Sequence, residues 1–232
     1  MKALKIIEHR MINNVGTATV QFFRIDPEDL SLTLSAILTR LMDLSWLSKF
    51  DADYKVKAFS SRANKTIADI QCKFDMCSDD KVTKDAGEYI VSELAREAIV
   101  DKLNYLDIPI GELLGKKKSG NPGFDFHSQN TTTDTIIFGE SKYVAATTAY
   151  STALPQMVEF INDGKDIEDL PELEPFCTAT ALQRVVDGHK GFAAAFSAKN
   201  TTSDKIIKNI LKRADFKELA TFEEMILVAV NL

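Results

Sequence analysis

The sequence lacks the features that mark a membrane-bound, secreted or nucleotide-binding protein. No apolar run approaches the roughly 20 residues that a membrane span needs, and the N-terminus does not resemble a signal peptide. The 232 residues contain three cysteines without metal-ligand spacing, and they contain no glycine-rich phosphate loop. We therefore expect a globular cytoplasmic protein with reduced thiols and no membrane partner.

Basic charge is also scarce. The chain has 28 basic and 34 acidic residues, which gives a net charge of −6. Proteins that grip duplex DNA alone usually present a basic face, because phosphate neutralisation supplies much of their affinity. The sequence offers one basic cluster, Lys116, Lys117 and Lys118, which is either a solubilising loop or a clamp for nucleic-acid phosphates. If the protein acts on DNA, we expect a partner to deliver or hold the DNA.

Hydrophobic periodicity predicts both helices and strands, and thus an α/β fold. The elements expected in the first part are a strand at 18–25, a helix opening at Asp26, and a hairpin formed by 54–59 and 66–74. The elements expected in the second part are a helix at 85–106, a strand at 108–114, a hairpin at 124–138, a helix at 145–161, a loop at 163–175, helices at 178–186 and 203–213, and a strand at 225–230. The polar stretch near residue 80 separates an expected N-terminal α+β lobe (1–80) from a core domain (81–232).

The hairpin at 124–138 is the most informative stretch. Its first strand alternates apolar and polar residues, a polar turn follows, and a β-branched and aromatic strand leads to Glu140-Ser141-Lys142. Glu140 and Lys142 are two residues apart, so on a strand they share a face, and pairing across the hairpin can bring Asp125 beside them. A divalent cation would offset the cost of placing these charges beside an apolar strand. His127 follows Asp125 by two residues and is either a contact for metal or phosphate, or a structural histidine.

Three glutamates lie on the helix predicted at 85–106. Glu88 opens the helix directly after Gly87, about 70° from the centre of the apolar stripe, by the 3.6-residue period. Glu97 lies about 110° from that centre and Glu93 about 150°, by the same period. We expect Glu93 to lie on the solvated face, Glu88 to contribute to a site, and Glu97 to be the substitute if Glu88 does not.

An Asp, a gap, and Glu-x-Lys after an apolar strand resemble the PD-(D/E)xK nuclease core, with Phe124-Asp125 in place of the usual Pro-Asp. More narrowly, GFDFH followed by IIFGESKY and an alanine-rich segment is similar to the HamA-like nuclease subunits of the Hachiman antiphage defence system and to their AbpA-like relatives. The resemblance extends from about Gly87 to Asp163. It implies a restriction-endonuclease-like core, a mixed sheet flanked by helices, within 81–232.

The resemblance implies a metal-dependent deoxyribonuclease that works with a HamB-like helicase subunit. Mg²⁺ or Mn²⁺ would be held by Asp125, Glu140, the main-chain carbonyl of Ser141 and Glu88, because oxygen ligands suit these hard cations. Lys142 would orient or help deprotonate the attacking water and offset charge in the transition state. The alternative is a catalytically inactive interaction or regulatory subunit of a nucleic-acid-processing complex. A restriction-type enzyme with its own sequence specificity is less expected, because no DNA-reading motif is evident.

Overall fold

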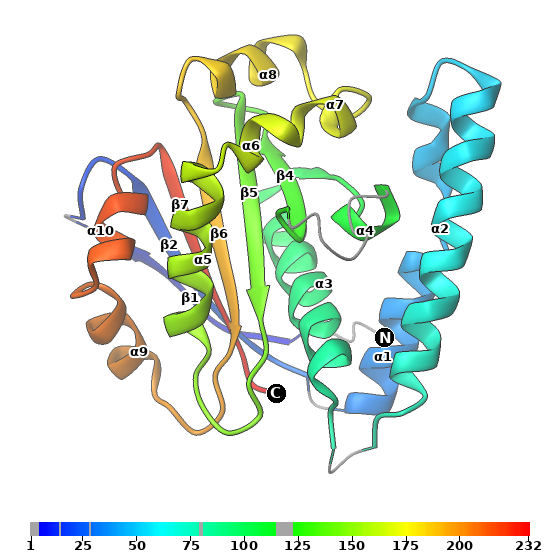
Figure 1. The fold of residues 1–232 in the computed structure, drawn as a ribbon. Helices are drawn as coiled ribbons and strands as arrows, with labels where there is room; N and C mark the ends of the chain where they lie inside the picture. The colour runs from blue at the N-terminus through cyan, green and yellow to red at the C-terminus, as the bar shows by residue number, and fades with distance from the viewer. Residues whose placement is uncertain (1–4, 14, 28, 79–80, 115–122) are drawn as a thin grey trace.

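The chain forms a mixed α/β structure around one sheet. The computed structural model describes residues 5–13, 15–27, 29–78, 81–114 and 123–232. These residues form a seven-stranded sheet of order β1-β2-β7-β6-β5-β4-β3 (Figure 1). The strands are β1 (Lys5–Ile12), β2 (Thr19–Asp26), β3 (Leu106–Asp107), β4 (Phe126–Asn130), β5 (Thr135–Lys142), β6 (Gly191–Ser197) and β7 (Glu224–Val230). The expected α/β class is confirmed.

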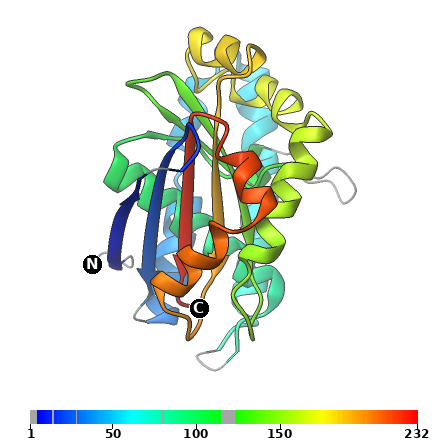
Figure 2. The ribbon, with the colours of Figure 1, turned by 90° about the vertical axis from the view of Figure 1, so that its left-hand side faces the viewer.

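The centre of the sheet is parallel and its edges are antiparallel. β2, β7, β6 and β5 run parallel to one another, whereas β1 pairs antiparallel with β2, and β4 pairs antiparallel with both β5 and β3. Figure 2 shows β1, β2 and β7 side by side. The four parallel strands therefore end along a single edge of the sheet. This edge carries the candidate site.

Helices cover both faces of the sheet. The helices described are α1 (Leu30–Leu41), η1 (a 3₁₀ helix, Ser45–Lys49), α2 (Asp53–Phe74), α3 (Lys84–Leu103), α4 (Gly111–Leu114), α5 (Tyr150–Asn162), α6 (Lys165–Glu168), α7 (Leu170–Leu173), α8 (Ala179–Val186), α9 (Ser203–Ile210) and α10 (Ala214–Leu219). α3 packs on one face with α1 and α2 outside it, and α5, α9 and α10 lie over the other face (Figure 1). Each face of the sheet thus has its own hydrophobic core.

Two predictions in the first 80 residues are wrong. The strand expected at 18–25 is confirmed as β2, but Asp29 rather than Asp26 caps the helix that follows, and its carboxylate accepts a hydrogen bond from the amide of Leu32 at 2.8 Å. The hairpin expected at 54–74 is the single helix α2. Its buried residues are Ala63, Ile67, Ile70 and Phe74. Their spacings of four, three and four residues follow a helical period, and no glycine or proline interrupts the segment.

The second half agrees better with the sequence. The helices at 85–106, 178–186 and 203–213, the hairpin, and the strand at 225–230 are confirmed within a few residues as α3, α8, α9, β4–β5 and β7. The strand expected at 108–114 is wrong, because the strand is Leu106–Asp107 and Gly111–Leu114 is helical. The helix expected at 145–161 begins only at Tyr150, and the segment expected as a loop at 163–175 contains α6 and α7.

The expected boundary near residue 80 does not divide the sheet. β1 and β2 precede that boundary, yet β2 pairs with β7 along its whole length, from Thr19 opposite Glu224 to Ile25 opposite Val230. The first 80 residues therefore supply two strands to the common sheet, while α1 and α2 pack on the outside of α3.

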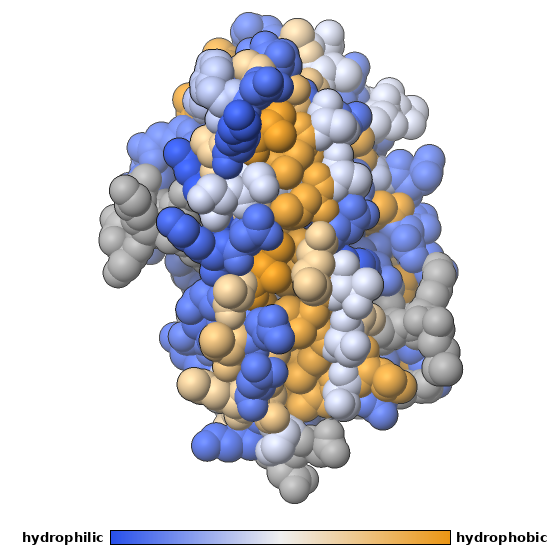
Figure 3. Space-filling model, turned by 90° about the vertical axis from the view of Figure 1, so that its right-hand side faces the viewer, coloured by the Kyte–Doolittle hydropathy of each residue, from blue (hydrophilic) through white to orange (hydrophobic). Residues whose placement is uncertain are grey.

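Among the described residues, one segment is apolar enough to cross a membrane by length and composition. It is Leu30–Lys49, which the sequence-based expectation overlooked, and only 17% of its most apolar window is buried. In the structure the segment consists of α1 and η1, with Met42–Leu44 between them. Thr33, Ile37 and Leu41 face the interior. A column of hydrophobic residues runs down the face of the molecule on which α1 and α2 lie (Figure 3).

Candidate active site

The hairpin places Asp125 beside the Glu-x-Lys strand. Phe126, the first residue of β4, lies opposite Gly139 of β5, so Asp125 stands level with the end of β5. The amide of Asp125 donates to the Gly139 carbonyl at 2.8 Å. The amide of Ser141 donates to the Asp125 carboxylate at 2.7 Å. The expected cross-strand neighbourhood of Asp125 and Glu140 is therefore present, and Ser141 contributes its N–H to it.

Glu140 and Lys142 form a largely buried ion pair at the end of β5. The Nζ atom of Lys142 lies 2.5 Å from Oε1 of Glu140, and Glu140 is 1% exposed. Burial by itself would lower the pKa of Lys142, but the charges of Glu140, Asp125 and Glu88 outweigh it and raise the pKa above its ordinary value. The charges of three carboxylates thus act on one ammonium group.

Glu88 reaches this site from the start of α3. Thr83 caps the helix by accepting a hydrogen bond from the amide of Ala86, which places Glu88 near the first turn. A cavity of about 190 Å³ lies beside it. The residues that line the cavity are Lys73, Asp85, Glu88, Tyr89, Ser92, Glu112 and Asp125. Glu88 and Asp125 therefore share one small cavity between α3 and the hairpin.

Glu112 is a carboxylate of this cavity that the sequence reasoning missed. It lies in the short helix α4 and is 8% exposed. The amide of Gly111 donates to the Asp125 carbonyl at 2.9 Å, which ties α4 to the start of β4. An acidic residue in the otherwise apolar run Ile110-Gly111-Glu112-Leu113-Leu114 was the available signal, because a carboxylate costs free energy to bury unless it has polar or charged partners.

The other two helical glutamates serve the packing of α3. The expectation that Glu93 is solvated is wrong: it is fully buried, and Oε2 accepts a hydrogen bond from Nη2 of Arg96 at 2.9 Å and pairs with Nη2 of Arg40 at 3.4 Å. Glu97 pairs with Arg40. Neither residue lines the cavity that contains Glu88 and Asp125. Of the three glutamates, only Glu88 is positioned at the candidate site.

His127 is structural in this arrangement. Its side chain is fully buried, Nε2 lies 2.9 Å from Oδ2 of Asp169, and its ring packs edge-on against Phe138. It is enclosed in the core and is not positioned to contact nucleic acid, so that suggestion is wrong. The other suggested nucleic-acid contacts, residues 116–118, lie outside the described residues.

The donor chemistry of the site suits a hard cation. Asp125, Glu88, Glu112 and Glu140 offer carboxylate oxygens, the ligand type that Mg²⁺ and Mn²⁺ take in proteins. In the part of the chain that the structure describes, however, no three His, Cys, Asp or Glu side chains are already arranged to hold a metal ion. These carboxylates are ligands of the type that a divalent cation takes. The contact between Glu140 and Lys142 would have to change for Glu140 to bind such a cation.

Comparison with known proteins adds no assignment. No family model matches the chain, and no curated protein matches it. The resemblance to PD-(D/E)xK nucleases therefore rests on the sequence motif and on the neighbourhood of its residues, Asp125, Glu140, Lys142 and Glu88.

Gly87 allows α3 to approach the end of β5. A Cβ at this position would lie 2.2 Å from the ring of Tyr143, the residue after Lys142. Alanine stabilises a helix interior by about 1 kcal/mol relative to glycine, but overpacking here should cost about 1–3 kcal/mol. We expect Gly87→Ala to lower the free energy of unfolding in urea. In a Tyr143→Ala background the same change should become neutral or stabilising, and a stabilising effect in the natural background would contradict this packing.

Proposed function

We propose that the protein is a metal-dependent deoxyribonuclease with a restriction-endonuclease-like PD-(D/E)xK core, similar to HamA-like nuclease subunits. The observation that carries the proposal is the convergence of Asp125, Glu140 and Glu88 on the Lys142 ammonium at the end of β5. A helix, an antiparallel hairpin with Asp125 and the Glu-x-Lys sequence, and a further helix follow one another as the resemblance requires.

The proposed roles of Lys142 and of the carboxylates follow from their charges. Lys142 carries a positive charge at neutral pH, because the surrounding carboxylates raise its pKa. It therefore donates a hydrogen bond to a phosphate oxygen and offsets the charge that develops in the transition state. Accepting a proton from water would require the neutral amine, so we favour electrostatic stabilisation by Lys142 over a role as general base. When bound, a divalent cation would polarise a phosphate oxygen and lower the pKa of the attacking water.

The carboxylates would hold that cation. Asp125 is oriented by the amide of Ser141 before substrate arrives, whereas Glu140 would have to turn from Lys142 to reach the cation. Glu88 and Glu112 face the same cavity as Asp125 and would complete the coordination directly or through water. The Ser141 carbonyl remains a proposed further oxygen ligand.

The second candidate function is a subunit that binds a partner without cleaving DNA. The hydrophobic column on the face of α1 and α2 favours it, because soluble proteins rarely expose a large continuous apolar patch unless the patch binds something (Figure 3). The two functions are compatible in one protein. Its net charge of −6 also favours a helicase partner of the HamB type, which would supply contacts to DNA phosphates.

The test is cleavage of supercoiled plasmid by the purified chain, with and without its co-encoded helicase. Parallel reactions contain Mg²⁺, Mn²⁺ or EDTA. Cleavage that needs both the cation and Lys142 supports the nuclease, whereas stable helicase binding without cleavage under any condition supports the second candidate.

Glu88 and Glu97 make a matched pair for this assay. Glu88→Gln is expected to lower the cleavage rate about 10–100-fold, the usual cost of losing a direct or water-bridged contact to a metal site. Glu97→Gln removes a carboxylate from the same helix, and the contact it breaks among the described residues is the ion pair with Arg40, so its cleavage rate should match that of the natural protein. Initial rates on plasmid at saturating Mg²⁺ measure both. The reverse order of activity would move the helical contribution to Glu97.

A further inference from the structure

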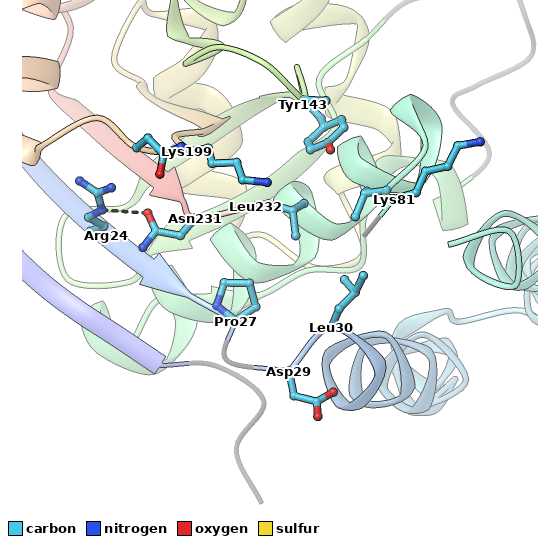
Figure 4. A pocket seen from close by; sticks show the side chains of 12 residues that line it. Arg24, Pro27, Asp29, Leu30, Lys81, Tyr143, Lys199, Asn231 and Leu232 are labelled. Atoms are coloured by element: carbon cyan, nitrogen blue, oxygen red, sulfur yellow. Dashed lines mark hydrogen bonds between the residues drawn. The ribbon is translucent and has the colours of Figure 1, made fainter. Parts of the chain in front are cut away.

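A large cavity lies outside the carboxyl ends of the parallel strands. It has a volume of about 760 Å³. The residues that line it are Arg24, Pro27, Asp29, Leu30, Lys81, Val82, Tyr143, Ala145, Lys199, Asn200, Asn231 and Leu232 (Figure 4). They come from the ends of all four parallel strands, from the start of α1 and from the segment before α3. In open parallel sheets this edge is where ligands bind, because the loops after the strands diverge there.

The loop after β6 is held in place at this cavity. Arg24 donates to the Thr201 carbonyl at 2.6 Å, to the Ala198 carbonyl at 3.2 Å, and to Oδ1 of Asn231 at 2.9 Å (Figure 4). Asn200 adopts φ +59°, a left-handed conformation that asparagine tolerates better than most residues. Lys199 therefore sits on a turn that is fixed on both sides.

Two exposed lysines border the cavity, and Figure 4 shows the side chain of Lys81 extending away from its centre. The ammonium groups of Lys199 and Lys81 form no hydrogen bond or ion pair with any residue that the structure describes. The one acidic side chain in the lining, Asp29, already accepts the amide of Leu32 as a helix cap. The hydroxyl of Tyr143 points into the cavity from the opposite wall (Figure 4). Unpaired cations beside a hydroxyl and amide donors are the chemistry that recognises a phosphate group.

We propose that this cavity binds a phosphate group, with Lys199 and, from the rim, Lys81 supplying charge and Tyr143 supplying a hydrogen bond. Tyr143 directly follows Lys142, so the cavity adjoins the candidate active site along β5. The phosphate binding itself stands apart from catalysis. The proposal that this phosphate belongs to a nucleic-acid backbone, close to the phosphate bound at Lys142, rests on the proposed function.

The experiment measures binding in EDTA, so that cleavage plays no part in it. A fluorescein-labelled oligonucleotide, single-stranded or duplex, is titrated with the natural chain at several salt concentrations. We expect Lys199→Ala and Lys81→Ala each to weaken binding about fivefold and to reduce the magnitude of the salt slope by about 0.9 on duplex, the value for one lost phosphate contact. Tyr143→Phe should weaken binding without changing the slope. Lys217→Ala, on the exposed side of α10, is the matched control and should change neither quantity.

A second arm identifies the source of the phosphate. Inorganic phosphate and a nucleoside monophosphate are tested as thermal stabilisers of the natural chain and of the Lys81→Ala/Lys199→Ala double variant. Loss of oligonucleotide binding in the double variant assigns the site to the nucleic-acid backbone. Unchanged oligonucleotide binding together with lost stabilisation by the small anions assigns it to a free phosphate compound. If the double variant matches the natural chain in both arms, or if Lys217→Ala shows the same losses, the cavity is not a phosphate site. If the natural chain cleaves no plasmid under any condition while these binding effects are observed, the proposed nuclease function is overturned and the phosphate site is not.

Discussion

Lys142→Ala is expected to lower the rate of DNA cleavage about 10²–10³-fold, the usual cost of losing one preorganised donor to a developing charge. Glu140→Gln should lose at least as much, because it removes a proposed cation ligand and the partner of Lys142 at once. Single-turnover rates on plasmid at saturating Mg²⁺ measure both. Lys208→Ala is the matched control: this lysine is exposed on α9 and lines neither cavity, so its loss should leave the rate unchanged.

The same two residues should differ in their effect on stability. Glu140 and Lys142 are a largely buried pair, so the loss of either one changes the electrostatic balance of the folded state. After loss of Glu140, the charges of Asp125 and Glu88 still stabilise the ammonium. After loss of Lys142, the carboxylates repel one another with no cation among them. In EDTA we therefore expect Lys142→Ala to be the less stable variant.

Added Mg²⁺ then provides a test that does not depend on activity. A ligand that binds only the folded state stabilises it, and the carboxylates of Lys142→Ala no longer compete with an ammonium for the cation. Mg²⁺ should raise the thermal midpoint of Lys142→Ala more than that of the natural chain, and Lys142→Arg should respond like the natural chain. Cleavage retained in Lys142→Ala, or no response to Mg²⁺ in any variant, would place the chemistry elsewhere.

The part of the site that lies on one hairpin could be predicted from sequence. Asp125, Glu140 and Lys142 lie on two strands joined by a short turn, so strand periodicity and turn chemistry already determine which residues are neighbours. Glu112 could not be found this way. Its place depends on the contact between α4 and the start of β4, which joins residues that no local pattern connects.

Two elements were missed because local composition suggests the opposite of what tertiary packing requires. Residues 191–197 include three consecutive alanines, a composition typical of helices, yet they form the central strand β6, fully buried on both faces. Small side chains there let α3 and α5 pack close to the sheet. The sequence of α2 resembles a hairpin locally. Only every third or fourth residue of the helix is buried, and over a short stretch such a pattern can look like the alternation of apolar and polar residues in a strand.

The largest stability effect is expected at Glu93 in α3. Its Oε1 accepts from Nε of Arg96 at 3.2 Å and its Oε2 from Nη2 at 2.9 Å, with both side chains buried. Burial alone would lower the pKa of Arg96, but Glu93 and Asp107 raise it, so the guanidinium stays charged. Glu93→Ala leaves that charge buried with Asp107, whose side chain is mostly exposed, as its remaining acidic partner among the described residues. Removing one member of a buried pair costs about 3–5 kcal/mol.

Urea unfolding of Glu93→Ala measures this loss directly, and Glu97→Ala, one turn along the same helix, is its control. Glu97 pairs with a partly exposed Arg40, and such pairs contribute about 0–1 kcal/mol. If the loss comes from the orphaned charge rather than from altered packing, Glu93→Met/Arg96→Met should recover most of it, because apolar replacement of a whole buried pair is often neutral. A double variant as unstable as Glu93→Ala would show that the shape of the pair matters more than its charge. Since Glu93 lies outside the cavity that holds Glu88 and Asp125, the folded fraction of Glu93→Ala should cleave DNA at the natural rate, which separates the residues that stabilise α3 from those that α3 presents to the site.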